Sequence, residues 1–453
     1  MFSRLKNIIG VSNAELLFLS WPIFVELFLR VIAGNINVYM ISDYSEAAVA
    51  SISSANQLIA LSVFVYGFIT VGAQILISHL IGARKNERIE QVMQTGIMGV
   101  FMLGLLISGA FLLLPHVFLK AINLSPELVL IGQNYLRIYG GTLIIPALTA
   151  IILAFLRTHS YTRPALVVPT FTMILGVIGN YFCLYQPFGL PNFGINGLAW
   201  STAFANTVGL IIAAVLLKRY LKFNILHVHP SKFSFSDIKE ILKLGLPSSG
   251  ESLSYQGAQV VVTMIVASLG DDVLAAKAYL LAITQLIALC TTSMAQGNQI
   301  MVGKLVGAKA YDVAKKRGFT TLKIGIATSV IICTITSFFI TPIMHIFTTQ
   351  QNIIDIAKYV ILVNIILEVG RATNQILVFS LNACGDAMYS LFCSFATLWV
   401  ISLPFSYLLA IHFGLGLVGV WIAYAIDECL RGCLMIYRWH SGVWQEKTKH
   451  KQL

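Results

Sequence analysis

Two segments that lie 225 residues apart decide the fold: Gln74-Ile-Leu-Ile-Ser-His-Leu-Ile-Gly-Ala83 and Gln299-Ile-Met-Val-Gly-Lys-Leu-Val-Gly-Ala308. Both begin with Gln-Ile and end with an aliphatic residue followed by Gly-Ala. Matches of leucine with leucine mean little in a chain this apolar. Gln-Ile and Gly-Ala pairs in one register, however, indicate an internal repeat.

Other informative residues match at the same offset, which extends the repeat over most of the chain. The matched pairs are Pro22 with Pro247, Glu26 with Glu251, Leu156 with Leu381 and, at an offset of 222, Gly194 with Gly416. Proline, glutamate and glycine are uncommon enough in apolar stretches for such matches to carry weight. We therefore expect two copies of one structural unit.

The composition predicts an all-α integral membrane protein. Of the 453 residues, 57% are hydrophobic and only 11% are charged, whereas a soluble domain carries about 25% charged residues. A bilayer-spanning helix needs about 20 apolar residues. Twelve apolar runs are predicted to span the bilayer, six in each copy. They cover residues 14–41, 53–79, 93–119, 128–156, 164–185, 194–217, 240–268, 276–303, 318–341, 353–382, 388–411 and 415–437.

Six spans bring the chain back to the side on which it started, so the two copies have the same orientation. We expect two six-helix bundles that are related by a pseudo-two-fold axis along the membrane normal, a transporter architecture with the substrate path between the halves. The predicted parts are an N-terminal bundle (1–217), a linker loop (218–239), a C-terminal bundle (240–437) and a basic tail (438–453).

Basic residues predict the orientation, because Lys and Arg are enriched in cytoplasmic loops. With the N-terminus inside, the inside segments carry 22 of them, and Arg157, Lys304 and Arg317 are included in that number. The outside segments carry three. We therefore expect a multi-pass protein of the cell membrane with both termini and the linker loop in the cytoplasm. The net charge of +11 then reflects topology and not binding of nucleic acid.

No motif in the chain supports an enzyme, a cofactor site or a channel. The segment 297–304 resembles a phosphate-binding loop, but five residues separate its glycines where four are required, and Leu305 replaces the Ser or Thr. His227 and His229 alone are too few ligands for a metal site. Neither a hydrolase motif nor a channel filter sequence occurs. We expect neither an enzyme nor a cofactor.

Several charged residues fall within the predicted spans, where a charge is costly and is usually paired or functional. Most have an opposite charge three or four residues away on the same helix face. These groups are Glu26 with Arg30, Glu368 with Arg371, and Asp427 and Glu428 with Arg431. The sequence leaves two interpretations open for each group: a neutralised pair that stabilises packing, or part of a functional site.

Glu251 differs from these residues, because no Lys or Arg lies within one helical turn of it. Desolvation disfavours the charged form of a carboxyl group that has no partner. Such a group could carry a proton, bind Na⁺ or bind an organic cation. The alternative is a structural role, in which Ser252, Ser254 or Gln256 binds the carboxylate, or a distant Arg137 pairs with it.

At this point the sequence resembles the multidrug and toxic compound extrusion (MATE) transporters over essentially its whole length. The resemblance rests on the duplicated segments at 74–83 and 299–308, and on three further segments in the expected order. These are Leu244-Gly-Leu-Pro247, Leu381-Asn-Ala-Cys-Gly-Asp386 and Gly416-Leu-Val-Gly-Val-Trp421. It implies two six-helix bundles around a V-shaped central cavity. It also implies export of amphipathic, often cationic, compounds in exchange for H⁺ or Na⁺.

The resemblance also implies where the ion and substrate site lies. Members commonly use an acid on the seventh helix, which Glu251 matches, and often one on the tenth helix, which Glu368 matches with Arg371 and Asn374 beside it. Many prokaryotic members carry an aspartate on the first helix, and here Asn37 takes its place. Tyr255 and Gln259 are weaker site candidates.

Glu26 lies 11 residues from Asn37, so it is not a direct substitute for the missing acid.

The main alternative function is a flippase for a lipid-linked or amphipathic precursor, which would need a more basic cavity. The arginines that could supply it are Arg30, Arg137, Arg371 and Arg431. The expected partners are small amphipathic organic molecules and membrane lipids, and a single chain can function alone.

Overall fold

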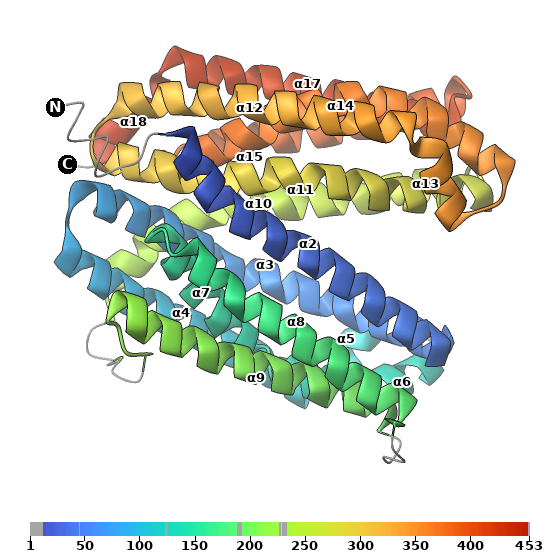
Figure 1. Cartoon of the computed structure of the whole chain (residues 1–453), viewed down its shortest axis with the longest axis horizontal. Coiled ribbons are helices and arrows are strands. Elements are labelled where there is room, and N and C mark those ends of the chain that lie inside the picture. Colours follow the sequence, from blue (N-terminus) through green and yellow to red (C-terminus); the bar gives the residue numbers. More distant parts are fainter. Residues whose placement is uncertain are drawn as a thin grey trace. The chain divides into compact units, whose positions relative to one another are not determined.

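The structure is a computed structural model that describes residues 12–44, 46–122, 126–187, 193–225, 228 and 233–451. Long helices account for nearly all of these residues, and none of the described residues lies in a strand (Figure 1). His227, His229 and parts of the predicted linker fall outside the described residues. The fold class predicted from composition is therefore confirmed in its all-helical character.

The helices of the first copy follow the apolar runs. They are α2 (Asn13–Tyr44), α3 (Glu46–Ala83), α4 (Asn86–Leu113), α5 (Pro115–Ala121), α6 (Pro126–Tyr135), the π-helix η1 (Leu136–Gly140), α7 (Ile144–Thr158), α8 (Thr162–Tyr185) and α9 (Gly194–Leu221). Helix α5 is short and begins at a proline, which is favoured in the first turn of a helix.

The helices of the second copy begin at α10. They are α10 (Phe235–Ala267), α11 (Asp271–Gly307), α12 (Tyr311–Phe338), α13 (Ile340–Phe347), α14 (Gln351–Ala383), α15 (Ala387–Thr397), η5 (Leu398–Ser402), α16 (Leu403–Tyr407), η6 (Leu408–His412), α17 (Gly416–Ser441) and α18 (Val443–Lys451). Helix α14 packs against α11, α12 and α17, and α12 and α17 run beside it in Figure 1.

The helix bounds repeat at the offset that the sequence predicts. Adding 225 to the bounds of α4 gives those of α12, and adding it to the bounds of α3 gives those of α11 to within one residue. Left-handed backbone recurs as well, at Arg84 and Lys309 and again at Ser160 and Gly385. The two copies thus share the ends of these helices and the geometry of these two turns.

The fourth helix of the first copy breaks where its counterpart is continuous. Pro126–Gly140 and Ile144–Thr158 meet at 45°, whereas α14 runs unbroken for 33 residues. Pro146 lies in the first turn of α7, where its missing N–H is tolerated but would interrupt a continuous helix. Arg371 occupies the matching position of α14. The sequence predicted one helix over 128–156, and the bend is a correction to it.

The chain separates into two compact units that differ from the predicted halves at the first helix of each half. Unit 1 consists of Met1–Phe24, Gly82–Arg84 and Pro247–Leu453, and unit 2 of Val25–Ile81 and Lys85–Leu246. The start of α2 therefore groups with the second copy, and the start of α10 with the first. Both divisions fall close to a proline inside a helix, Pro22 in α2 and Pro247 in α10.

Small residues allow this exchange of helix ends. In unit 2, a Cβ atom on Gly245 would lie 1.7 Å from the backbone oxygen of Phe68, so α10 and α3 are in backbone contact. In unit 1, a Cβ atom on Gly297 would lie 2.5 Å from Oγ of Ser20. Gly245 and Ser20 are themselves matched at an offset of 225. Each copy therefore uses the same crossing position.

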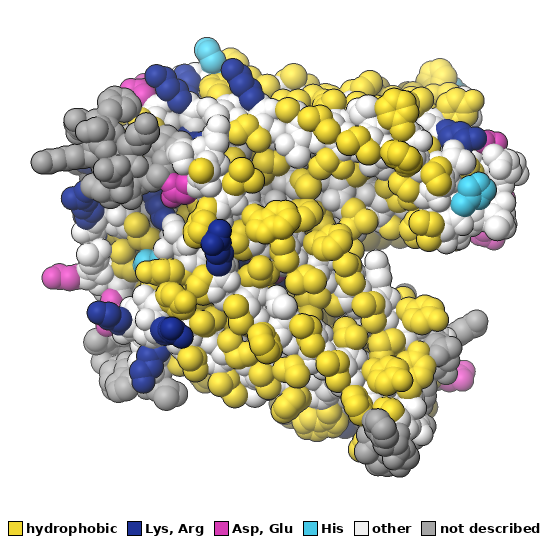
Figure 2. All heavy atoms as spheres, viewed as in Figure 1, with side chains coloured by type: hydrophobic (Ala, Val, Ile, Leu, Met, Phe, Trp, Pro, Cys, Tyr) yellow, Lys and Arg dark blue, Asp and Glu magenta, His cyan; other side chains and the backbone are white. Residues whose placement is uncertain are grey.

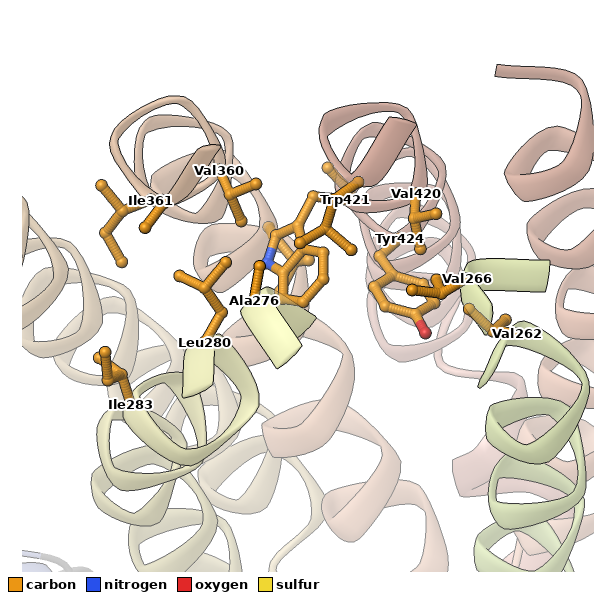
Figure 3. Packing of buried hydrophobic residues seen from close by; sticks show 14 of the residues in the cluster. Val262, Val266, Ala276, Leu280, Ile283, Val360, Ile361, Val420, Trp421 and Tyr424 are labelled. Carbon is orange, nitrogen blue, oxygen red and sulfur yellow. The ribbon is translucent and has the colours of Figure 1, made fainter. Parts of the chain in front are cut away.

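Each unit has an apolar core beneath an apolar surface. In unit 1, side chains from α10, α11, α14 and α17 pack around Trp421 and Tyr424, whose rings lie 5.7 Å apart (Figure 3). On the face in Figure 2, hydrophobic side chains cover the helix flanks, and most Lys and Arg side chains lie toward helix ends. Exposed residues such as Phe204, Ile211 and Phe338 suit contact with lipid.

Eight described helical segments are long and apolar enough to cross a membrane, or nine if the bent pair forms one span. Helices α10, α14 and α17 do not pass this test, although they contain 33, 33 and 26 residues. These three carry the polar and charged residues described below. The chain is therefore a multi-pass membrane protein, and twelve spans remain a prediction.

Many of the basic residues that were counted in the inside segments lie within helices, and Arg157, Lys304 and Arg317 are three examples. Arg157 belongs to α7 and pairs with Glu26, Lys304 belongs to α11, and Arg317 of α12 donates to Asn13 over 2.9 Å. Lys304 and Arg317 are buried. These residues hold helices together, so they are weaker orientation markers than the sequence indicated, and the orientation remains a prediction.

Candidate functional site

Helix α10 presents a stripe of polar side chains at a spacing of four residues, which places them on one helix face. The stripe begins with Glu251 and continues through Tyr255 and Gln259. All three are partly buried. The hydroxyl of Tyr424 on α17 donates to Oε1 of Gln259 over 2.8 Å, which ties the stripe to the neighbouring helix.

The hydrogen-bond partner of Glu251 lies on α15, and no local sequence pattern predicts this contact. Oγ of Ser394, on α15, donates to Oε1 of Glu251 over 2.6 Å. None of the partners considered from sequence makes this contact. Among the described residues, Glu251 has no ion pair. Its negative charge is therefore held by a neutral hydroxyl group.

The predicted pair on α14 is present and deeply buried. Nη1 of Arg371 lies 2.6 Å from Oε1 of Glu368, whose side chain is completely inaccessible to solvent. Their spacing of three residues places them on adjacent turns of one helix face. Because charge-assisted hydrogen bonds at this length are among the strong ones, the pair is a fixed element of the site.

The predicted group on α17 is also present. Nη2 of Arg431 lies 2.7 Å from Oδ2 of Asp427 and 2.8 Å from Oε1 of Glu428. Nδ2 of Asn374 donates to Oε2 of Glu428 over 3.0 Å, which links α14 to α17. Asn374 therefore belongs to the same hydrogen-bonded group as the α17 residues.

These side chains form one network of electrostatic interactions in unit 1, in which the α14 and α17 acids are buried and Glu251 is partly buried. Glu251 interacts electrostatically with Arg431 and Glu428, and Tyr255 interacts with both arginines of the network. The network contains four carboxyl groups, those of Glu251, Glu368, Asp427 and Glu428, and two guanidinium groups, those of Arg371 and Arg431. If every group is ionised, two negative charges are in excess. A low-dielectric interior penalises such an excess unless protons or cations compensate it.

The matching acid of unit 2 is fully compensated. Glu26 accepts a hydrogen bond from Arg30 over 3.1 Å and another from Arg157 of α7. Only 5% of its side chain is exposed. The pair with Arg30 was predicted, whereas Arg157 was missed because it had been assigned to a loop. Two guanidinium groups on one carboxylate leave no need for a further cation.

Asn37 also lies in unit 2, where it pairs with a second amide side chain. Nδ2 of Asn180, on α8, donates to Oδ1 of Asn37 over 2.9 Å. Neither amide can take up or release a proton at physiological pH. Of the candidate residues, unit 1 therefore brings six together, and Glu26 and Asn37 belong to unit 2.

The arginines considered for a basic lipid-binding cavity are mostly neutralised. Arg371 and Arg431 each contact carboxylates, and Arg30 contacts Glu26. Arg137 is exposed in η1, and among the described residues no carboxylate pairs with it.

The site also contains residues that were not among the predicted site residues, namely Ser394 and the α17 triad of Asp427, Glu428 and Arg431. The spacing of its charges indicated the triad from the sequence, but no sequence pattern indicated Ser394.

Comparison with known proteins agrees with the repeat and the fold. The MatE family model matches residues 22–182 and again 247–408. Similar curated proteins include the uncharacterized transporter YisQ of Bacillus subtilis, 34% identical over 95% of this chain and 94% of its own length. Another is the probable multidrug resistance protein NorM of Thermotoga maritima, 23% identical over 98% and 95%.

Solved structures share the fold at low sequence identity. A MATE structure in the straight conformation has a TM-score of 0.88 at 18% identity and covers 98% of this chain and 99% of its own. A MOP superfamily transporter from Pyrococcus furiosus, whose binding pocket is described as reversed in polarity, has a TM-score of 0.87 at 18% identity and covers 98% of each chain. With both family-model matches and the YisQ similarity spanning the repeat, the chain belongs to the MatE family, the MATE transporters.

Proposed function

We propose that this transporter exports amphipathic, often cationic, organic compounds in exchange for H⁺ or Na⁺. The observation that carries the proposal is the excess of acid in the network of unit 1, where the hydroxyl of Ser394 binds Glu251 and no described Lys or Arg pairs with it. A nearby cation strongly stabilises an ionised carboxylate in such surroundings. A proton, Na⁺ and an organic ammonium group are three cations that could provide this stabilisation.

Exchange follows if these cations compete for one carboxylate. When Glu251 holds a proton it has no charge to offer, so an organic cation leaves. When the proton leaves, the carboxylate again attracts a cation. Glu368 and Arg371 keep the neighbouring charge fixed, and Tyr255 and Gln259 offer polar contacts along α10. Among the described residues no three His, Cys, Asp or Glu side chains could hold a metal, so Na⁺ at Glu251 would need hydroxyl, amide or backbone oxygen ligands as well.

The membrane arrangement is part of the same proposal. Helices α10, α14 and α17 join the apolar helices to give twelve spans in two bundles around a V-shaped cavity. Their polar residues then face protein and not lipid, which the bilayer requires. Both termini lie in the cytoplasm, and a single chain works by alternating access in the cell membrane.

Transport in proteoliposomes tests the proposal when pH and Na⁺ gradients are imposed separately. We expect wild type to exchange a fluorescent organic cation against one of the two gradients. Glu251→Gln keeps the shape of the side chain but removes its charge, so exchange should fall to background. Glu87→Gln, which changes an exposed carboxyl group on α4, serves as the control. Full gradient-driven exchange by Glu251→Gln would refute the role of the carboxylate.

The exposed Arg137 favours one second candidate, a flippase for an anionic lipid-linked precursor. A lipid phosphate could pair with this guanidinium group. The two candidates are separated by a translocation assay with a labelled polyprenyl phosphate in the same proteoliposomes. Lipid translocation that is lost in Arg137→Gln and retained in Glu251→Gln would support the flippase.

A further inference from the structure

Lys277 is a buried cation outside the acidic network. It lies in the second turn of α11, and only 3% of the residue is exposed. Its ammonium group donates to Oγ1 of Thr263, on α10, over 2.7 Å. Among the described residues, no carboxylate pairs with it. This lysine is therefore desolvated without the countercharge that buried ions normally have.

A single hydroxyl partner does not satisfy this group. An ammonium ion has three N–H donors, and Thr263 accepts one of them. Burying a charge without a partner is costly, and in proteins such groups are usually paired or bind an ion or ligand. Lys277 is therefore set up to receive an acceptor, and a negatively charged acceptor would stabilise it most.

The first copy of the repeat shows that the fold does not need this charge. At an offset of 225, Lys277 corresponds to Ile52 and Thr263 corresponds to Val38. Ile52 is buried in α3, as Lys277 is in α11. The matching place is thus filled by two aliphatic side chains in unit 2 and by an ammonium–hydroxyl pair in unit 1. Packing alone does not account for the difference.

The surroundings of Lys277 suit an amphipathic ligand. Thr263 is exposed and continues the polar stripe of Glu251, Tyr255 and Gln259, so the ammonium group lies just beneath a surface that carries this stripe. Neighbouring residues on the same helices, among them Val262, Ala276 and Leu280, belong to the apolar cluster of unit 1 (Figure 3). A compound bound here would find a positive charge at the border of an apolar region.

We propose that Lys277 and Thr263 form an anion site that binds the carboxylate group of an amphipathic substrate. The proposal rests on the transport function above and deepens it, because it adds compounds with an acidic group to the substrate class. Twelve residues separate Thr263 from Glu251, about 18 Å along the axis of α10 at the helical rise. The site therefore lies apart from the acidic network, and the two can be tested independently.

Equilibrium dialysis of the purified full chain with 1-naphthylacetate and its uncharged amide, 1-naphthylacetamide, tests this site. The two probes share their aromatic part and differ in the charge that Lys277 would recognise. We expect wild type to bind the carboxylate about tenfold more tightly, as one charge-assisted hydrogen bond allows. Lys277→Met should abolish the preference and leave amide binding unchanged, and Lys277→Arg should keep it. Lys120→Met removes an exposed lysine elsewhere and should change nothing.

Equal binding of both probes by wild type would overturn the proposal, as would a preference that survives in Lys277→Met. Thr263→Val provides a second variant that alters only an exposed side chain, and it should reduce the preference about threefold. The outcome is distinguishable from failure of the proposed function. If Glu251→Gln keeps full cation exchange while the carboxylate preference depends on Lys277, the exchange mechanism fails and the anion site stands.

Discussion

Glu26 and Glu251 occupy matching positions of the two copies, yet their surroundings are opposite. Each lies four residues after a proline within the first helix of its copy. Glu26 is bound by two arginines, whereas Glu251 is bound by one serine hydroxyl. Duplication thus supplied the same acid twice. Its neighbours place Glu26 in a structural group with two arginines, whereas Glu251 has no ion-pair partner among the described residues.

The fourth helices of the two copies show the same divergence. Where α6, η1 and α7 form a bent helix in unit 2, α14 is straight enough to run continuously and carries Glu368 and Arg371. At an offset of 225, these two residues correspond to Leu143 and Pro146 at the bend. The first copy therefore has a backbone irregularity at the place where the second has a fixed ion pair.

The largest effect is expected from exchanging the two acids for glutamine one at a time and measuring stability. Glu26→Gln leaves Arg157, with 17% of its side chain exposed, without a countercharge. Breaking a buried pair in this way costs about 3–5 kcal/mol. Glu251→Gln removes an unpaired charge, so we expect a change of less than about 1 kcal/mol. Chemical unfolding in detergent measures both, and equal losses would contradict the comparison.

A smaller effect is expected at the helix crossing that both copies share. Gly245→Ala would push a Cβ atom against the backbone oxygen of Phe68, which cannot rotate away. Overpacking of this kind costs about 1–3 kcal/mol. The matched position in unit 1 already holds Ser20, so Ser20→Ala should change stability by less than about 0.5 kcal/mol. Thermal unfolding of the two variants tests this, and equal tolerance at both sites would show that the crossings are equivalent.

Sequence reasoning recovered what depends on periodicity and short spacing. The repeat offset relates the bounds of α3 and α4 to those of α11 and α12, and the intrahelical pairs of Glu368 and Arg431 follow from side chains three or four residues apart on a helix. These features are local, because one helical turn brings the residues together whatever the rest of the chain does.

Contacts between distant helices could not be predicted in this way. Ser394 lies 143 residues from Glu251, and Arg157 lies 131 residues from Glu26. Many serines and arginines could have reached either acid, and only the packing of the helices selects one. Arg157 was assigned to a loop because charge counting treats every basic residue near a span end as solvated. Its burial against Glu26 is decided by tertiary structure.

The smallest effect is expected from a variant that gives Glu251 the arginine neighbour that Glu26 has. This variant tests most directly whether that neighbour makes the two acids different. Tyr255 corresponds to Arg30 at an offset of 225. In Tyr255→Arg, a guanidinium group would lie four residues after Glu251, in the favourable order of acid before base. It should neutralise Glu251 as Arg30 neutralises Glu26, and lower the rate of organic-cation exchange about tenfold, which corresponds to roughly 1.4 kcal/mol. Tyr255→Phe removes the hydroxyl without adding charge and should lose less. Arg30→Tyr leaves Glu26 paired with Arg157 and should transport almost as wild type. If Tyr255→Arg exchanges as fast as Tyr255→Phe, neutralisation of the carboxylate is not what distinguishes the two copies, because a guanidinium group beside Glu251 would then leave exchange intact.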